Sequence, residues 1–278
     1  MAVTFHESSI PAEQYATGVL RQRMLTAERV GNSPVLLDRF TINAGAAVIL
    51  GVPQSDLAWF QILQGSVVLQ HDAGTHALDT AHIAFLPPEF RGEISAATDA
   101  ILLYAQVPDA GRFDAAFAAQ PPSFRIVDWT REPVLDSEHD ARKRIYLVTP
   151  KLFGTKALKG EMIIYPPGTE GANHHHEGAE HFMYVLQGSG TAYANEQPIS
   201  VREGALVHYA DRERHYLRSD DGVEMRFVEF FVPGSYRTVW APGAPVCTWI
   251  PTGRSITGDR PVRDIEKHSS AAATPTDV

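Results

Sequence analysis

The chain is poor in cysteine, in positive charge and in long apolar runs, and each shortage excludes a class of protein. Its 278 residues include one cysteine, Cys247, so an internal disulfide framework is excluded. Acidic residues outnumber basic ones by 33 to 24 without a basic stripe, so we expect no nucleic-acid partner. The longest apolar run, near residues 44–52, is too short to span a bilayer, and the segment MAVTFHESSIPAEQ lacks a signal-peptide pattern. We therefore expect a cytoplasmic protein that enters no membrane.

The chain does contain a succession of short alternating segments separated by Gly, Pro and Asp. Val67–Leu78 and Thr191–Val201 have the pattern of β-hairpins, and an all-β fold is predicted. Between them, residues 108–124 predict a short helix that carries Phe113 and Phe117 on one face. Residues from about Thr257 onward lack apolar periodicity and predict a disordered tail.

Four histidines stand at spacings that suit a metal site in a small β-barrel. His174 and His176 are two residues apart, so they share one face of a strand. His181 falls on the next predicted strand, and His215 follows Gly204 on a third segment. Neutral imidazoles bind zinc, iron, copper, nickel and manganese, so the residues predict a metal without naming it.

The chain also repeats itself with an offset of 123 residues. Phe60-Gln-Ile-Leu-Gln-Gly65 aligns with Met183-Tyr-Val-Leu-Gln-Gly188, and Gly45 aligns with Gly168. Such self-similarity predicts two copies of one β unit, and the 44% hydrophobic content is sufficient for two cores.

The repeat predicts which face of each strand points inward and which copy holds the metal. The face of His181, Met183 and Val185 aligns with an apolar face in the first copy, so it should point inward and Glu180 should point outward. The same offset places residues without ligand atoms opposite the four histidines: Gly51, Pro53, Ala58 and Gly92. We therefore predict that the first copy is metal-free.

These residues resemble the cupin family, and more narrowly the two-domain bicupins. Gly168-x5-His174-x-His176-x4-His181-x6-Gly188 is similar to the first cupin motif, with histidine in place of the usual glutamate. Gly204, with His215 eleven residues later, is similar to the second motif. The resemblance implies two tandem cupin barrels of jelly-roll (double-stranded β-helix) type and, because cupins commonly pair through their sheets, a homo-oligomer.

Among bicupins the layout resembles the (S)-ureidoglycine aminohydrolase family of manganese enzymes, which release ammonia from an aminal carbon. That family has a metal-free first cupin, a metal in the second, and a histidine at the position of His181. Thr149-Pro-Lys-Leu-Phe-Gly154 and Pro166-Pro-Gly168 are also similar in kind. The family's first-slot glutamate is His174 here, its second-motif glutamine is His215, and the lysine expected on the last strand is missing from Phe227-VEFFVPG.

The expected domains follow from the repeat and the resemblance together. The ranges are a metal-free first barrel at 15–108, a linker with a short helix at 109–137, a metal-binding second barrel at 138–240 and an extension with a disordered tail at 241–278.

Several polar residues near the predicted metal are candidates for substrate contact or catalysis. Glu229 and Arg226 stand on opposite faces of the predicted last strand, so only one can line the cavity. Glu229 shares its face with Phe227 and Phe231, where a charge without a function is costly. Tyr209 is expected, together with Arg212 and Arg214, in the loop that leads to His215. Cys247 lies in a proline-bounded segment and is expected to be a packed structural thiol.

Two enzymatic functions are consistent with these residues, both with one Mn(II) or Fe(II) per chain and a small-molecule substrate. The bicupin layout favours hydrolysis of a C–N bond in a small polar organic acid with release of ammonia. The all-nitrogen ligand set favours instead an Fe(II) dioxygenase that cleaves a C–C bond of a diketone or hydroxyaromatic compound. A metal-stabilised binding or storage protein is the third alternative, because a fold does not fix a function.

Overall fold

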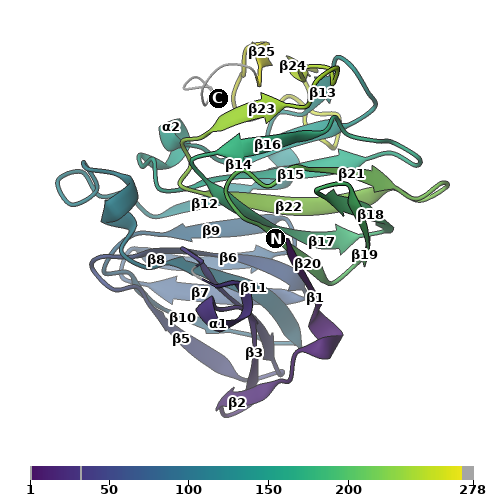
Figure 1. Cartoon of the computed structure of the whole chain (residues 1–278). Coiled ribbons are helices and arrows are strands. Elements are labelled where there is room, and N and C mark those ends of the chain that lie inside the picture. Colours follow the sequence, from purple (N-terminus) through teal and green to yellow (C-terminus); the bar gives the residue numbers. More distant parts are fainter. Residues whose placement is uncertain (1, 32, 271–278) are drawn as a thin grey trace. The chain divides into compact units, whose positions relative to one another are not determined.

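The computed structural model describes residues 2–31 and 33–270 and contains two β-barrel units, each with its own core (Figure 1). The first unit spans Glu7–Trp129. The second unit combines the N-terminal strand β1 (Val3–His6) with the chain from Thr130 onward. In each unit, side chains from two antiparallel sheets meet in one apolar cluster, which confirms the all-β fold and the two jelly-roll barrels.

The first unit has a larger and a smaller sheet. The larger sheet runs in the order β12 (Arg125–Asp128), β9 (His82–Leu86), β6 (Leu57–Gln64), β11 (Ala100–Val107), β4 (Leu36–Ile42), β3 (Val19–Leu25) and β2 (Glu13–Ala16). The smaller sheet runs in the order β5 (Ala47–Gly51), β10 (Arg91–Ser95), β7 (Ser66–His71) and β8 (Gly74–Asp79).

The second unit is built in the same way. Its larger sheet runs in the order β1, β20 (Ala205–Tyr209), β17 (Glu180–Gln187), β22 (Met225–Val232), β15 (Lys159–Tyr165), β14 (Lys143–Val148), β13 (Leu135–Ser137), β24 (Thr248–Pro251) and β25 (His268–Ser269). Its smaller sheet runs in the order β19 (Gln197–Arg202), β18 (Ser189–Ala194), β21 (His215–Ser219), β16 (His174–Glu177) and β23 (Arg237–Trp240).

The helices are short throughout the described residues. They are α1 (Ala27–Val30), α2 (Pro150–Phe153) and the 3-10 turns Glu7–Ser9, Ala110–Phe113 and Trp129–Arg131. Each helix within this part of the chain is too short to cross a membrane.

The repeat expected from the sequence is present as pairs of equivalent strands. Strands β4, β6, β7, β8 and β9 each reappear 123 residues later as β15, β17, β18, β19 and β20. Gly65 and Gly188 close the same turn with φ values of 76° and 78°, and a Cβ at either would collide with a backbone carbonyl oxygen. The predicted inward faces are confirmed, since Phe60 and Met183 lie in the two cores.

One detail of the predicted alignment is wrong by a single residue. His215 pairs with His174, whereas the equivalent Gly92 pairs with Leu50, so Leu50 and Val52 rather than Gly51 and Pro53 occupy the histidine positions. Leu50 and Val52 are both buried in the apolar core of the first barrel.

The predicted linker at 109–137 is not a separate segment. Its residues 125–128 form β12, which pairs with β9 in the first unit, and its residues 135–137 form β13 in the second unit. The predicted helix is limited to the 3-10 turn Ala110–Phe113 because Asp114 takes an extended conformation. These strands are too short to show an alternating pattern in the sequence.

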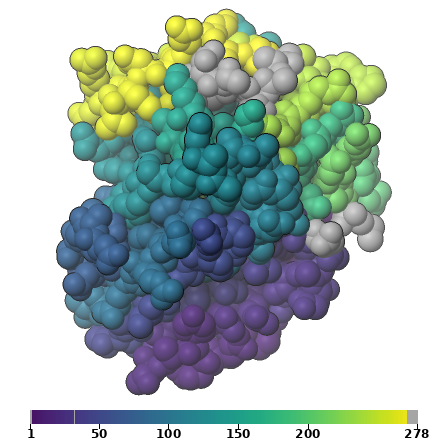
Figure 2. All heavy atoms as spheres, turned by 90° about the vertical axis from the view of Figure 1, so that its left-hand side faces the viewer, coloured from purple at the N-terminus to yellow at the C-terminus, as the bar shows by residue number. Residues whose placement is uncertain are grey.

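The C-terminal extension is ordered through residue 270, contrary to the predicted disorder from Thr257 onward. Cys247, Trp249 and Ile265 are buried in one cluster with Leu135 and Tyr146. The yellow C-terminal segment lies directly against the rest of its unit (Figure 2). Isolated apolar anchors hold it, and they carry no periodic signal. The predicted tail beyond residue 270 lies outside the described residues.

Candidate metal centre

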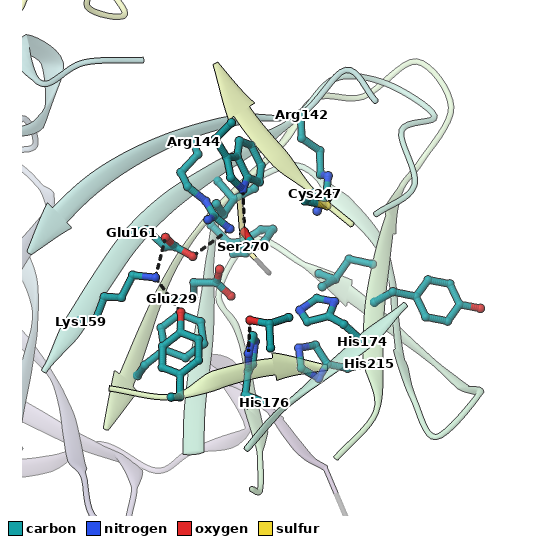
Figure 3. Close-up of a pocket in the computed structure, with 18 of the residues that line it drawn as sticks. Arg142, Arg144, Lys159, Glu161, His174, His176, His215, Glu229, Cys247 and Ser270 are labelled. Carbon is teal, nitrogen blue, oxygen red and sulfur yellow. Dashed lines mark hydrogen bonds and ion pairs between the residues drawn. The ribbon is translucent and has the colours of Figure 1, made fainter. Parts of the chain in front are cut away.

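Three of the four predicted histidines meet inside the second barrel. His174 and His176 extend from β16, and His215 extends from the neighbouring β21 (Figure 3). The three offer ligand nitrogens that all lie within 4.8 Å of one another. Within the described residues, no other group of three potential ligands gathers in this way.

Each of these histidines is hydrogen-bonded through Nδ1. In His174, Nδ1 lies 2.8 Å from the carbonyl oxygen of Ala172, and in His215 it lies 2.7 Å from that of Glu213. A carbonyl oxygen accepts only, so these Nδ1 atoms carry the protons and donate. Nδ1 of His176 is 3.2 Å from the Thr238 hydroxyl. In His174 and His215, Nε2 therefore remains as the lone-pair donor for a metal, an orientation that outer hydrogen bonds commonly fix, and the Thr238 hydroxyl can accept from Nδ1 of His176 to the same effect.

His181, the fourth predicted ligand, points inward from β17 beside this group. Its ring centroid lies 4.6 Å from that of His215 and 5.0 Å from that of His176. Its ring stacks between those of Tyr209 and Phe231. The imidazole is 2% exposed, and neither of its nitrogens has a hydrogen-bond partner. An imidazole buried in this way is poorly satisfied unless a metal binds it, so the donor set fits a metal ion.

Burial keeps all four imidazoles neutral near neutral pH. It lowers the pKa of His215 to about 4. Burial, reinforced by the neighbouring histidines, holds the pKa values of His174, His176 and His181 well below their usual range. Neutral imidazole is the form that binds metals, so no proton has to leave before binding.

The pocket continues from the histidines to a charged wall on β14, β15 and β22. Glu161 and Glu229 face each other directly across β15 and β22. Glu161 lies 3.1 Å from Arg144 and 3.7 Å from Lys159. The Lys159 amine donates to the Tyr236 hydroxyl at 2.7 Å. In Figure 3, Glu229 lies between this charged group and the histidines.

The two glutamates have opposite pKa shifts. Burial, followed by the charge of Glu161, raises the pKa of Glu229 well above its usual range. Burial alone would also raise the pKa of Glu161, but Arg144 and Lys159 outweigh it and lower that pKa. Burial thus favours the protonated form of Glu229, and the two cations favour the ionised form of Glu161, a division typical of acid–base sites.

The C-terminal segment forms another part of the pocket wall. Cys247 is buried, and its sulfur accepts a hydrogen bond from Arg142 at 2.9 Å. Trp249 stacks on the guanidinium of Arg144, whose central carbon is 4.0 Å from the ring centroid. The indole nitrogen of Trp249 donates to the Ser270 hydroxyl at 3.1 Å. The pocket between these walls has a volume of about 50 Å³.

The other predicted site residues are placed differently. Glu229 lines the pocket, whereas Arg226 lies on the other face of β22 and pairs with Glu224 at 3.0 Å. Tyr209 is not in a loop: it ends β20 and is fully buried against His181 and His215.

The remaining candidates around the barrel lie outside the pocket. Arg212 is exposed and pairs with Asp211 at 3.6 Å, and Arg214 does not line the pocket. Glu180 points outward, as expected, and its carboxylate lies 3.0 Å from Nε2 of His208.

Of the charged wall the sequence predicted Glu229 but not Arg144, Lys159 or Glu161, because charged residues on short strands usually face solvent. A signal was present in the repeat, since Arg144 and Glu161 lie 123 residues after Arg21 and Asp38. Charged residues that recur at inward-facing positions of both copies would have indicated a polar cavity in each barrel.

Comparisons with known proteins agree with the fold. Residues 161–231 match the family model described as Cupin domain. No curated protein matches the chain.

Solved structures match across most of the chain. Oxalate decarboxylase from Bacillus subtilis has a TM-score of 0.67 at 13% identity, over 85% of this chain and 78% of that one. The protein Ylba from E. coli has a TM-score of 0.65 at 12% identity, over 83% of this chain and 90% of that one. Identities this low establish the fold alone.

Proposed function

We propose that this protein, a cupin of two-barrel (bicupin) fold, is a metal-dependent enzyme that releases ammonia by hydrolysing a C–N bond of a small polar organic acid. The observation that carries the proposal is the charged wall opposite the histidines. It holds Glu229, whose pKa burial raises well above its usual range, directly across from Glu161 on the strand that also carries the buried Lys159. An amine leaves a carbon atom readily only when its nitrogen receives a proton, and Glu229 is the group of this wall whose raised pKa suits it to supply one.

The histidines would hold one divalent ion such as Mn(II) or Fe(II). His174, His176 and His215 would bind through Nε2, with His181 as the fourth nitrogen donor beside them. When bound, such an ion supplies Lewis-acid polarisation of the substrate and of water.

Proton transfer is the task of the glutamates. Glu229 gives its proton to the departing nitrogen, which leaves as ammonia, and the resulting carboxylate is stabilised by nearby Arg144 and Lys159. A water oxygen then bonds to the carbon that lost the nitrogen, and the proton released from that water returns to Glu229. Glu161 keeps Arg144 and Lys159 in position throughout.

Lys159 compensates for one difference from the aminohydrolase pattern, the missing lysine on the last strand. The lysine expected on the last strand is absent from β22, but Lys159 projects from the neighbouring β15. Its register partner on β22 is Phe231, and its ammonium lies 5.5 Å from the centroid of that ring. The chain therefore supplies a cation to the pocket from an adjacent strand.

We expect Glu229→Gln to lower the rate of ammonia release by roughly 10²–10⁴-fold, because an amide cannot donate the proton. Metal content should remain unchanged, since Glu229 is not among the proposed ligands. Glu224→Gln, on the turn before β22 and paired with Arg226, is the matched control and should leave the rate unchanged. Full activity in Glu229→Gln would refute the assigned role.

The all-histidine ligand group favours a second function, an Fe(II) dioxygenase.

One experiment separates the two functions. If the protein is the hydrolase, anaerobic protein reconstituted with Mn(II) should release ammonia from ureidoglycine or a related aminal of a ureido or amino acid, without oxygen consumption. Oxygen uptake with a diketone or hydroxyaromatic acid by Fe(II) protein, and no ammonia release, would refute hydrolysis and favour the dioxygenase.

A further inference from the structure

The first barrel contains a cavity of its own, with a volume of about 250 Å³. It opens among β3, β4, β11 and α1, entirely within the unit Glu7–Trp129. Its polar lining includes Arg21, Arg23, Asp38, Tyr104 and Gln106.

This cavity is the counterpart of the charged wall in the second barrel. Asp38 faces Tyr104 across β4 and β11, in the same register as Glu161 and Glu229 across β15 and β22. Arg21 lies opposite Phe40 in the register of β3 and β4, as Arg144 lies opposite Ile163 in that of β14 and β15. A barrel kept only for its fold would be more stable with apolar residues at these inward positions.

In the first barrel, the positions equivalent to the histidines of the second barrel offer no space or ligand for a metal. Gly92 stands at the position of His215, and a Cβ there would come within 2.9 Å of Phe90. The rings of Phe90 and Phe124 stack with centroids 5.6 Å apart. Leu50 and Val52 occupy the positions of the other histidines, so the cavity has apolar residues where a metal would bind.

Arg23 and Asp38 carry opposite charges in this cavity, and in the described part of the chain neither has a close partner of opposite charge. Arg21 makes two hydrogen bonds to Glu13, at 2.9 and 2.6 Å, which leaves it a long 3.8 Å contact with Asp38. Arg23 is the register partner of Asp38, and its charge acts on Asp38 and on Glu28, which also lines the cavity, without a close ion pair to either within the described residues. Asp38 is one-fifth exposed, and burial raises its pKa to about 6 although Arg21 opposes the shift.

Neutral acceptors complete the cavity. Gln106 donates through its amide nitrogen to Asp56 at 2.5 Å, so its carbonyl oxygen remains available as an acceptor. The phenol of Tyr104 can donate or accept.

We propose that this cavity is a metal-free binding site for a small zwitterion of the amino-acid type. The ligand carboxylate pairs with Arg23, and its ammonium group pairs with Asp38 and the carbonyl oxygen of Gln106. Both charges are then satisfied in a site that the chain itself leaves incompletely paired, and charge-assisted hydrogen bonds of this kind are strong. The site is separate from the metal centre and does not depend on the reaction proposed there.

The test is isothermal titration of the full chain with L-alanine and L-asparagine, compared with propionate and ethylamine. Propionate lacks the ammonium group and ethylamine lacks the carboxylate, so each should bind at least about tenfold more weakly than L-alanine. Arg23→Gln and Asp38→Asn should each weaken amino-acid binding by about tenfold or more. Unfolding curves of both variants establish that they are folded.

His176→Ala, in the second barrel, is the matched control and should leave amino-acid binding unchanged. Three results would overturn the proposal: no binding of either amino acid, binding that survives both first-barrel substitutions, or binding that disappears in His176→Ala.

Discussion

A few hydrogen bonds determine which atoms the histidines present to a metal. The carbonyl oxygens of Ala172 and Glu213 fix the protons of His174 and His215 on Nδ1. His181 differs because neither of its nitrogens is engaged. Its place between two aromatic rings fixes the plane of the ring but satisfies no polar atom. A metal would satisfy one of these atoms, so His181 has the most to gain from binding.

His181→Gln should therefore weaken metal binding by at least roughly 100-fold, because it removes an inward nitrogen donor. Glu180→Gln, the neighbouring residue on the outer face of β17, should keep the metal and lose only its contact with His208. Equilibrium dialysis against a divalent metal measures both. If Glu180→Gln lost the metal and His181→Gln retained it, the face of β17 that carries Glu180, not the one that carries His181, would point into the barrel.

Asp38 predicts a pH dependence of stability. Its folded pKa of about 6 lies above the ordinary 3.8, so the folded state holds this proton more tightly than the unfolded chain does. The resulting stabilisation is present below pH 3.8 and is lost as the pH rises through about 6.

Asp38→Asn should remove this loss. The free energy of unfolding of the variant minus that of the wild type, measured by urea unfolding, should be roughly 2–3 kcal/mol larger at about pH 7.5 than at about pH 4. An equal difference between variant and wild type at both pH values would contradict the burial of this carboxyl group.

The sequence predicted the part of the site that has an unusual composition. Four histidines in the eight residues 174–181, and Glu229 among phenylalanines, are rare enough to indicate chemistry. Lys159, Arg144 and Glu161 were missed because charged residues in a strand of seven or fewer residues also fit solvent-facing positions. Only the cross-strand register shows that they point inward.

At the scale of elements, glycine turns and strand length could be predicted, and long-range packing could not. The repeat around Gly65 and Gly188 predicted the register of β6 and β17 because a one-residue slip would turn every side chain to the other face. The two-residue strand β25 and the four-residue β24 have no detectable period. Their place depends on Trp249, which is fully buried and stacks on Arg144.

Trp249→Ala should thus destabilise the protein by roughly 3–5 kcal/mol, since it leaves a large cavity and releases the C-terminal segment. Chemical denaturation measures this change. Ile250→Ala, at the neighbouring residue that is 38% exposed, is the control and should change stability by less than about 1 kcal/mol. Equal effects of the two substitutions would mean that the segment after Ala244 is not anchored through Trp249.

At the scale of the whole molecule, two copies of one barrel differ in what they keep. The second copy has the histidines and a charged wall. The first has the counterpart of the wall, Arg21 and Asp38, with apolar side chains where the histidines would be. The repeat predicted this asymmetry of the metal ligands, but the retained cavity was hidden because its residues are scattered over three strands.

We infer that the chemistry of this protein depends on one metal ion held by the histidines of the second barrel. Metal analysis of protein purified without chelator tests it most directly, on the wild type and on His176→Ala. The wild type should carry about one divalent transition metal per chain, and His176→Ala should carry almost none, because one of the three clustered ligands is lost. Equal metal content in the two proteins, or a wild type that binds no such metal when it is supplied, would contradict the claim.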